Sequence, residues 1–376
     1  MKSINHLELE KFINIVYDKS LSSYIWGGTG IGKSETISKV AQDIARENKK
    51  KFIDWNRISD EHKRELLKDD VFEESFIFCD IRASQLDSSD TRGLPTFVNN
   101  FVEWKPNLVF KVLSNPKASG ILFLDELNLA PPSILASLYQ VILDRCIGEI
   151  SFPDSVVPIA ASNRIEDRGA VFELPAPLAN RFLHLELKVP DVESWTAYGL
   201  DNGHKIDSRI ISFLQFKPSR IYSYDSRNKD KSFATPRMWV KTSKLIEGID
   251  SEDLDLIETL VSSSVGEGIA VEFTAFLKLA RKIDVESLIK KPESVKNIKE
   301  IDLKYSVLAT VSEYYRNHKT ANILKGVIQI CANMETEFGV LLSRLVKAVD
   351  VEFWRKEVIK IPDFKEWARA NEKYLF

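Results

Sequence analysis

The sequence predicts an α/β domain with a mainly parallel sheet, followed by a region built of helices. Three observations predict it. In the first half, short runs rich in β-branched and aromatic residues alternate with stretches of helical periodicity. The glycine-rich segment Trp26–Glu35 ("WGGTGIGKSE") lies between one such run and one such stretch. After Pro190 the strand-like runs cease, and amphipathic segments replace them.

Five strands are expected in the first half, each dominated by apolar residues. They are Ser23–Trp26, Ser75–Ile81, Gly120–Leu124, Val156–Ser162 and Phe182–Leu187. A helix is expected over Lys33–Glu47, because its apolar residues recur at helical spacing. The polar segment 54–70 is also expected to be helical. A further helix is expected within residues 131–146, whose leading prolines suit a first helical turn.

The second half is expected to be helical throughout. Amphipathic segments cover residues 207–216, 235–246, 253–265 and 270–283. Further helical runs follow, separated by "KKPESVK" and "KIPDF". We therefore expect an α/β domain over residues 1–190, an all-helical domain over 191–282 and a helical extension over 283–376.

Composition and charge exclude several classes of protein. A chain of 376 residues exceeds one typical core, so two or three packed units are expected. The net charge of −3 gives no overall bias toward nucleic acid or an anionic membrane. No apolar run approaches a membrane span, and the N-terminus lacks the apolar core of a signal peptide. Cys79, Cys146 and Cys331 are scattered, which favours a reduced, cytoplasmic location.

The glycine-rich segment has the full P-loop spacing, Gly27-x-x-x-x-Gly32-Lys33-Ser34. Glycines allow backbone N–H groups to surround phosphate oxygens, and the helix that follows adds the positive end of its dipole. Lys33 would reach the β- and γ-phosphates, and Ser34 would bind Mg²⁺. The alternative is a glycine-rich turn that precedes a helix by chance. Nucleotide contacts are expected from the whole loop: Gly27, Gly28, Thr29, Gly30, Ile31, Gly32, Lys33, Ser34 and Glu35.

A second motif, "ILFLDE" (Ile121–Glu126), places two carboxylates after a buried strand. Asp125 would hold Mg²⁺ through the water shell of the ion. Glu126 would polarise the attacking water. Alone, an apolar run that ends in Asp-Glu is common at strand ends. After a P-loop, the pair favours ATP hydrolysis over binding alone.

Two later residues fit the same chemistry. Asn163 ends the strand "IAASN" with an amide that could bridge the γ-phosphate and the catalytic water. It could equally close the strand in an Asx turn. Arg181 precedes the last expected strand, where a guanidinium could stabilise phosphate charge. A surface ion pair is the alternative for a lone arginine.

Taken together, these motifs resemble the AAA+ ATPases, and in particular their MoxR-like (dynein-related) branch. The resemblance covers roughly residues 21–282. It rests on "LDELNLAPPSILASLYQVILDRCIGEI", "SQLDSSDTRGLP", "PLANRF" and "TPRMW". One departure is the phosphate loop, "GGTGIGKS", where many relatives have a proline near the second position.

The resemblance implies both a fold and a set of roles. It implies a sheet of order 5-1-4-3-2, with nucleotide at the carboxyl ends of the strands. Asp125 and Glu126 would form the Walker B pair, and Asn163 would be a sensor of the γ-phosphate. Arg181 would be the finger that completes the neighbouring subunit's ATP site, and Arg237, in "TPRMW", would be the arginine of the helical lid.

The resemblance also implies an assembly and a purpose. A trans-acting arginine requires a ring, usually a hexamer, in which ATP and Mg²⁺ are the cofactors. Such rings commonly work with a partner that carries a von Willebrand factor A domain, here a separate chain, and remodel or activate another protein. Two alternatives stay open: a nucleotide-gated assembly scaffold and a DNA-directed motor. The acidic balance weighs against the motor and against nucleic acid as a partner.

Three aromatic residues occupy a segment where this family inserts elements that face the central pore. Phe97, Phe101 and Trp104 lie within "LPTFVNNFVEWKPNLVFKVL". They could grip a substrate there. Burial between strands is the alternative, and the ordinary one for large apolar side chains.

Overall fold

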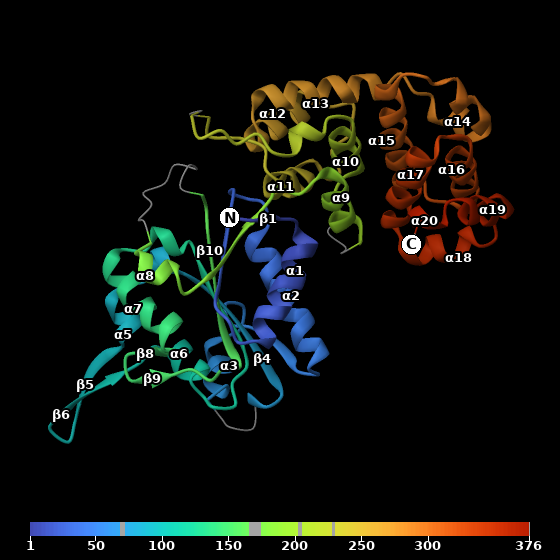
Figure 1. Cartoon of the computed structure of the whole chain (residues 1–376). Coiled ribbons are helices and arrows are strands. Elements are labelled where there is room, and N and C mark those ends of the chain that lie inside the picture. Colours follow the sequence, from blue (N-terminus) through green and yellow to red (C-terminus); the bar gives the residue numbers. More distant parts are fainter. Residues whose placement is uncertain (68–71, 165–173, 202–204, 228–229, 376) are drawn as a thin grey trace. The chain divides into compact units, whose positions relative to one another are not determined.

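The computed structural model describes residues 1–67, 72–164, 174–201, 205–227 and 230–375. The chain forms two compact units, Met1–Val189 and Pro190–Phe376 (Figure 1). We describe each by itself. The separation of the second unit into a lid and an extension at residue 282 stays a prediction.

Seven parallel strands form the main sheet of the first unit, in the order β1-β11-β2-β10-β7-β4-β3. Their bounds are β1 Ser3–Ile4, β2 Ser23–Gly27, β3 Lys51–Asp54, β4 Ser75–Arg82, β7 Gly120–Asp125, β10 Val156–Ser162 and β11 Leu183–Leu187. Five of these are the expected strands. Read in the order of those five, the sheet is 5-1-4-3-2, so the predicted order is confirmed. Strands β1 and β3, at the two edges, were not predicted.

The central strands are continuous apolar runs because helices cover both faces of the sheet. All seven residues of β10 are buried. Helices α1 and α2 lie on one side of the sheet, and α6 and α7 lie on the other (Figure 1). One hydrophobic core joins Tyr24 of β2 and Leu122 of β7 to Leu138 of α7. The sheet is thus enclosed on both faces, and loops follow the carboxyl ends of its strands.

The helices of the first unit are α1 His6–Asp18, α2 Lys33–Glu47, α3 Asp60–Glu65, α5 Ser88–Arg92, α6 Leu108–Leu113, α7 Pro132–Leu143 and α8 Ala176–Ala179. Helix α2 has the predicted bounds. In the described part of the segment 54–70, α3 is the only helix, and Asp54 belongs to strand β3. Residues 68–70 of that segment lie outside the described residues.

Two short antiparallel hairpins complete the first unit: β5 Leu94–Val98 with β6 Phe101–Lys105, and β8 Cys146–Ile147 with β9 Ile150–Ser151. Asn99 and Asn100 turn the first hairpin with φ values of 49° and 64°, as a type I′ turn requires. Its aromatic side chains are exposed: Phe97 by 81%, Phe101 by 74% and Trp104 by 42%. Burial between strands is therefore wrong for these three residues. Whether they line a pore stays a prediction.

The second unit is helical, as predicted. Its helices are α9 Val192–Asp201, α10 Ser208–Phe216, α11 Pro236–Ile246, α12 Leu254–Val265, α13 Glu267–Ala280, α14 Val285–Lys290, α15 Ile301–Asn317, α16 Ala321–Asn333, α17 Thr336–Val349, α18 Val351–Val358, α19 Pro362–Ala370 and α20 Glu372–Leu375. None of the described helices is long and apolar enough to span a bilayer.

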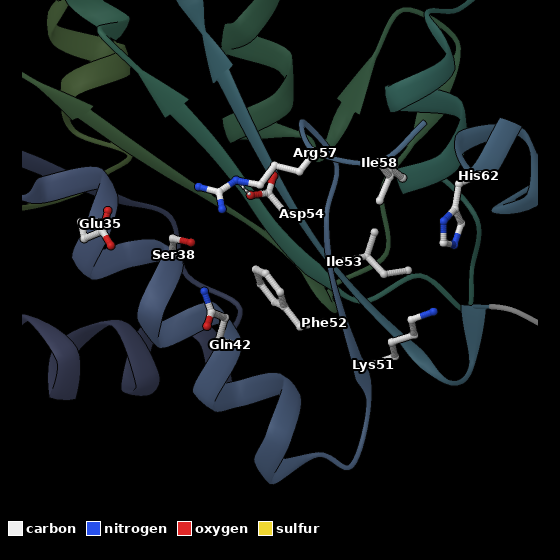
Figure 2. A pocket seen from close by; sticks show the side chains of 10 residues that line it. All are labelled: Glu35, Ser38, Gln42, Lys51, Phe52, Ile53, Asp54, Arg57, Ile58 and His62. Carbon is white, nitrogen blue, oxygen red and sulfur yellow. Dashed lines mark ion pairs between the residues drawn. The ribbon is translucent and has the colours of Figure 1, made fainter. Parts of the chain in front are cut away.

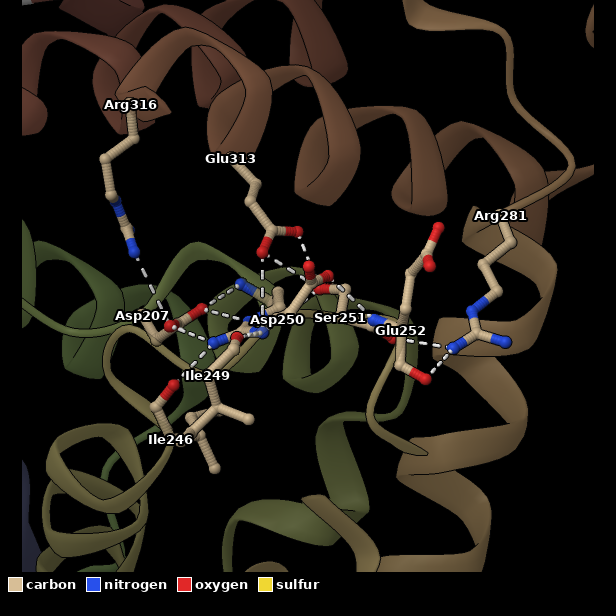
Figure 3. A network of polar contacts seen from close by, with 10 residues as sticks. Asp207, Ile246, Ile249, Asp250, Ser251, Glu252, Arg281, Glu313 and Arg316 are labelled. Carbon is tan, nitrogen blue, oxygen red and sulfur yellow. Dashed lines mark hydrogen bonds and ion pairs between the residues drawn. The ribbon is translucent and has the colours of Figure 1, made fainter. Parts of the chain in front are cut away.

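A buried ion network ties the helices of the second unit together (Figure 3). The Arg209 guanidinium donates to both carboxylate oxygens of Asp207, from Nε at 3.0 Å and from Nη2 at 2.9 Å. It also donates to the Ile246 carbonyl at the end of α11. Glu313 and Arg316 of α15 complete the network, at 3.4 Å from Arg209 and 3.6 Å from Asp207. This network joins helices on both sides of the predicted boundary at residue 282.

Candidate nucleotide-binding site

The phosphate loop connects β2 to α2 through positions that only glycine fits. Gly32 caps α2 with a φ of 98°, in the left-handed region that favours glycine. At Gly27, an added Cβ would lie 2.9 Å from the Leu187 carbonyl oxygen of the neighbouring strand. The loop therefore packs directly against the end of β11.

Lys33 lies at the base of this loop and is buried. Its ammonium donates to the carbonyls of Gly27 and Gly28, at 2.8 and 2.9 Å. A third bond, of 2.9 Å, goes to Oδ1 of Asn163 at the end of β10. The lysine and the asparagine predicted from the sequence are thus hydrogen-bonded to each other.

The two residues expected to bind Mg²⁺ also meet. The Ser34 hydroxyl donates to Oδ2 of Asp125 at 3.1 Å. Hydroxyl and carboxylate oxygens are the hard ligands that Mg²⁺ prefers, and the ion commonly takes one or two such protein ligands beside a nucleotide. The residues present therefore fit a magnesium ion.

Glu126 occupies a conformation that is rare for a non-glycine residue. Its φ is 54° and its ψ is 37°, in the left-handed region. Its N–H donates to Oδ1 of Asp125 at 3.0 Å, and its Oε2 accepts from the Ser84 hydroxyl at 3.0 Å. Backbone strain of this kind concentrates at functional sites. Ser84 thus donates a hydrogen bond to the carboxylate that is the expected catalytic base.

Buried polar contacts hold the loop that follows β10. The Tyr24 and Ser162 hydroxyls are 2.6 Å apart, and Asn128 donates its N–H to Ser162 and its Nδ2 to the Asn163 carbonyl. Burial raises the pKa of Tyr24 far above its usual value, so its hydroxyl stays protonated. Asn163 is therefore fixed from behind while its amide oxygen faces Lys33.

His6 contacts the phosphate loop from outside the predicted motif. Its Nε2 lies 2.8 Å from the Ile31 carbonyl, so this nitrogen carries the proton and donates it. A capping box between Asn5 and Glu8 starts helix α1 at this residue. The N-terminal strand and helix thus brace the loop.

Of the two predicted arginines, Arg181 is not hydrogen-bonded to this cluster and Arg237 belongs to the second unit. Arg181 is exposed between α8 and β11 and makes no side-chain hydrogen bond or ion pair to another described residue. Arg237 is exposed in the first turn of α11, in the second unit. A cation there opposes the helix dipole, so helix stability does not account for it.

A hollow of about 340 Å³ lies beside α2 and strand β3 (Figure 2). It shares only Glu35 with the predicted site. Its other lining residues are Ser38, Gln42, Lys51, Phe52, Ile53, Asp54, Arg57, Ile58 and His62. Asp54 forms an ion pair with Arg57 inside it. The hollow is therefore distinct from the phosphate loop.

The structure brings together Lys33, Ser34, Asp125, Glu126 and Asn163, which are five of the predicted site residues. Sequence reasoning missed His6, Ser84, Asn128 and Ser162, which position them. Ser162 and Ser84 carry a weak signal in the sequence: each is a polar residue at or just after the carboxyl end of a predicted strand. His6 carries none, since the segment before the first predicted strand offers no motif.

The chain is only distantly similar to known proteins. No protein-family model and no curated protein matches the sequence. Among solved structures, the chain is similar to PCH-2 of C. elegans (13% identity, 74% of this chain and 70% of that chain, TM-score 0.33). It is also similar to ORC2 of Aeropyrum pernix in ADPNP–ADP complexes (12%, 93% and 93%, 0.30) and to NtrX of Brucella abortus with ADP (12%, 98% and 67%, 0.37). Similarities this low carry no argument about activity, which rests on the residues above.

Proposed function

We propose that this protein is an ATPase of the AAA+ type, which binds ATP with Mg²⁺ and hydrolyses it. The observation that carries the proposal is the contact of Lys33 with Asn163 and of Ser34 with Asp125 at the carboxyl ends of adjacent parallel strands. Ligands bind at this edge of open α/β sheets. The sheet order and the glycine geometry at Gly27 and Gly32 support the same conclusion.

Each residue has a distinct task in the proposed reaction. Loop N–H groups and Lys33 bind the phosphates, Ser34 and Asp125 hold the magnesium ion, and Glu126 takes a proton from the attacking water. The magnesium ion, when bound, neutralises the charge that develops on the phosphates. Ser84 keeps the Glu126 carboxylate oriented until the water is in place.

The finer parts of the proposal concern assembly. We infer that Arg181 completes the site of a neighbouring copy, because it is exposed and makes no side-chain hydrogen bond or ion pair with another described residue. Ring formation, a hexamer by the resemblance, follows from that role. Arg237 would read the γ-phosphate from the helical lid. A MoxR-like remodelling role, with a separate von Willebrand factor A partner, rests on the sequence motifs alone.

Substitution of Glu126 by glutamine tests the proposal. ATP turnover should fall by about 10²- to 10⁴-fold, because an amide cannot accept the proton. Binding of a fluorescent ATP analogue should persist, whereas Lys33→Ala should abolish it.

Glu61→Gln, on the exposed face of α3, is the matched control and should leave both measurements unchanged. Turnover of Glu126→Gln at the native rate would overturn the assigned base. Equal nucleotide binding by the native chain and Lys33→Ala would overturn the site itself.

A further inference from the structure

Asp80 is a carboxylate near the candidate site that the functions above do not use. It lies near the carboxyl end of β4, and its backbone carbonyl accepts a hydrogen bond of 2.7 Å from Asn56. Its side-chain Oδ1 is buried and receives no hydrogen bond from any described residue. A buried oxygen without a donor costs free energy, so its presence calls for an explanation.

The register of the sheet shows where this side chain lies. Asp80 pairs with Phe123 of β7, and Arg82 pairs with Asp125. Paired residues point to the same face, and residues two apart share it. Asp80 and Asp125 therefore share one face of the sheet, about 8 Å apart between Cα atoms from standard strand spacings. This is the face against which α2, with Ser34, packs.

The charges around Asp80 are mostly of its own sign. Burial is the largest cause, and together with Asp125, Asp54 and Glu126 it raises the pKa of Asp80 to about 6, while Arg82 acts in the opposite direction. The fold thus places a third acidic group beside Asp125 and Glu126 without giving its buried oxygen a donor. Such an unfavourable placement is typical of a residue that serves a ligand rather than the fold.

We propose that Asp80 is a positioning residue for the hydrated magnesium ion that Ser34 and Asp125 hold, and that its Oδ1 accepts a hydrogen bond from a metal-bound water. This inference rests on the proposed function. Among the described residues, no three acidic, histidine or cysteine side chains gather closely enough to bind a metal directly. Mg²⁺ keeps most of its waters, so a carboxylate one strand away acts through water. Asp80 would thereby orient the ion from its outer shell.

The test compares native protein with Asp80→Asn, in the full chain, by equilibrium binding of fluorescently labelled ADP at increasing Mg²⁺ concentrations. Asparagine keeps the shape but loses the charge and one acceptor. The Mg²⁺ concentration for half-maximal enhancement of binding should rise about tenfold, as for other outer-shell partners of metal sites. Binding in EDTA should stay unchanged, since the loop and Lys33 are intact.

Asp54→Asn is the matched control, because Asp54 lies on the same face one strand farther from Asp125 and already has Arg57 as its partner. It should leave the Mg²⁺ dependence unchanged. Asp80→Ala is a second variant and should give the same rise, which separates the carboxylate from the shape of the side chain. Thermal unfolding verifies that both variants fold.

The outcomes separate the inference from the function beneath it. A native chain that binds no labelled nucleotide, with or without Mg²⁺, overturns the proposed function. A native chain with Mg²⁺-dependent binding, matched by Asp80→Asn at the same Mg²⁺ concentrations, overturns the role of Asp80 alone. An equal rise in Asp54→Asn also overturns it, since any lost carboxylate would then suffice.

Discussion

Two aspartates, the buried Asp207 and the half-buried Asp80, lie one in each unit and have opposite surroundings. Asp207 caps α10, receives the backbone N–H of Arg209 and is paired through both oxygens with the guanidinium of that residue. Asp80 has a buried oxygen without a donor, and burial together with its acidic neighbours raises its pKa. The first carboxylate is satisfied by the fold alone. The carboxylate of Asp80 needs a hydrogen-bond donor that the fold does not supply. This difference distinguishes a structural acid from a functional one.

The largest expected effect is a loss of stability when the partner of Asp207 is removed. Arg209→Ala would remove the guanidinium that binds both oxygens of the buried Asp207 and leave it only the more distant Arg316, which should cost about 3–5 kcal/mol of unfolding free energy. Chemical denaturation measures this. Arg227→Ala, at the exposed pair with Asp225, should cost about 0–1 kcal/mol and is the control. If both variants lose equally little, the network in Figure 3 is not what holds α10 to α15.

An intermediate effect is expected at Ser84. Ser84→Ala removes the hydrogen bond to Glu126, so the carboxylate should lose its fixed orientation and ATP turnover should fall about tenfold. Unfolding free energy should change little, because Ser84 only supports the site. Ser114→Ala, which removes a helix-end hydroxyl bonded to the Lys111 carbonyl, is the control for turnover. Native turnover in Ser84→Ala would show that Glu126 needs no such support.

The smallest expected effect is on the unfolding free energy of Asp80→Asn without nucleotide. This substitution should stabilise the protein, whereas Arg209→Ala should destabilise it. The folded pKa of about 6 exceeds the ordinary value of 3.8. The unfolded chain therefore ionises first, and native stability falls as the pH rises from about 4 to 6 and stays reduced above that. Asp80→Asn should remove this loss. A gain of about 1 kcal/mol is expected at neutral pH, after allowance for partial exposure, and none near pH 4. Thermal unfolding between pH 4 and neutral pH measures this gain in stability. A loss of stability at neutral pH would show that Asp80, like Asp207, serves the fold.

The sequence predicted the parts of the fold that are determined by burial. Five strands were found because they are covered on both faces and consist of apolar runs. Strand β1 has two residues and only Ile53 is buried in β3, so neither forms such a run. The hairpin at Asn99 and Asn100 was missed, although two adjacent asparagines between apolar residues are a signal for a type I′ turn.

For the site, the sequence predicted residues that belong to motifs and missed those placed by register. Lys33, Ser34 and Asp125 follow from fixed spacings. Asp80 and Ser84 reach the site only because β4 lies beside β7, which is a fact of tertiary structure. The roles predicted for Arg181 and Arg237 depend on a second copy of the chain and on the helical lid, and not on register within the sheet.

The close packing of the phosphate loop on β11 has a mechanical consequence. Strand β2 is hydrogen-bonded to β11 along its whole length, from Ser23 beside Leu183 to Gly27 beside Leu187. Arg181 stands two residues before Leu183. The loop proposed to bind one nucleotide and the arginine proposed to serve the next therefore lie at the two ends of one pair of hydrogen-bonded parallel strands. Because β2 and β11 are hydrogen-bonded, a rotation of the phosphate loop would also rotate Arg181. In an assembly, movement at one nucleotide site would then be coupled to movement at the neighbouring site.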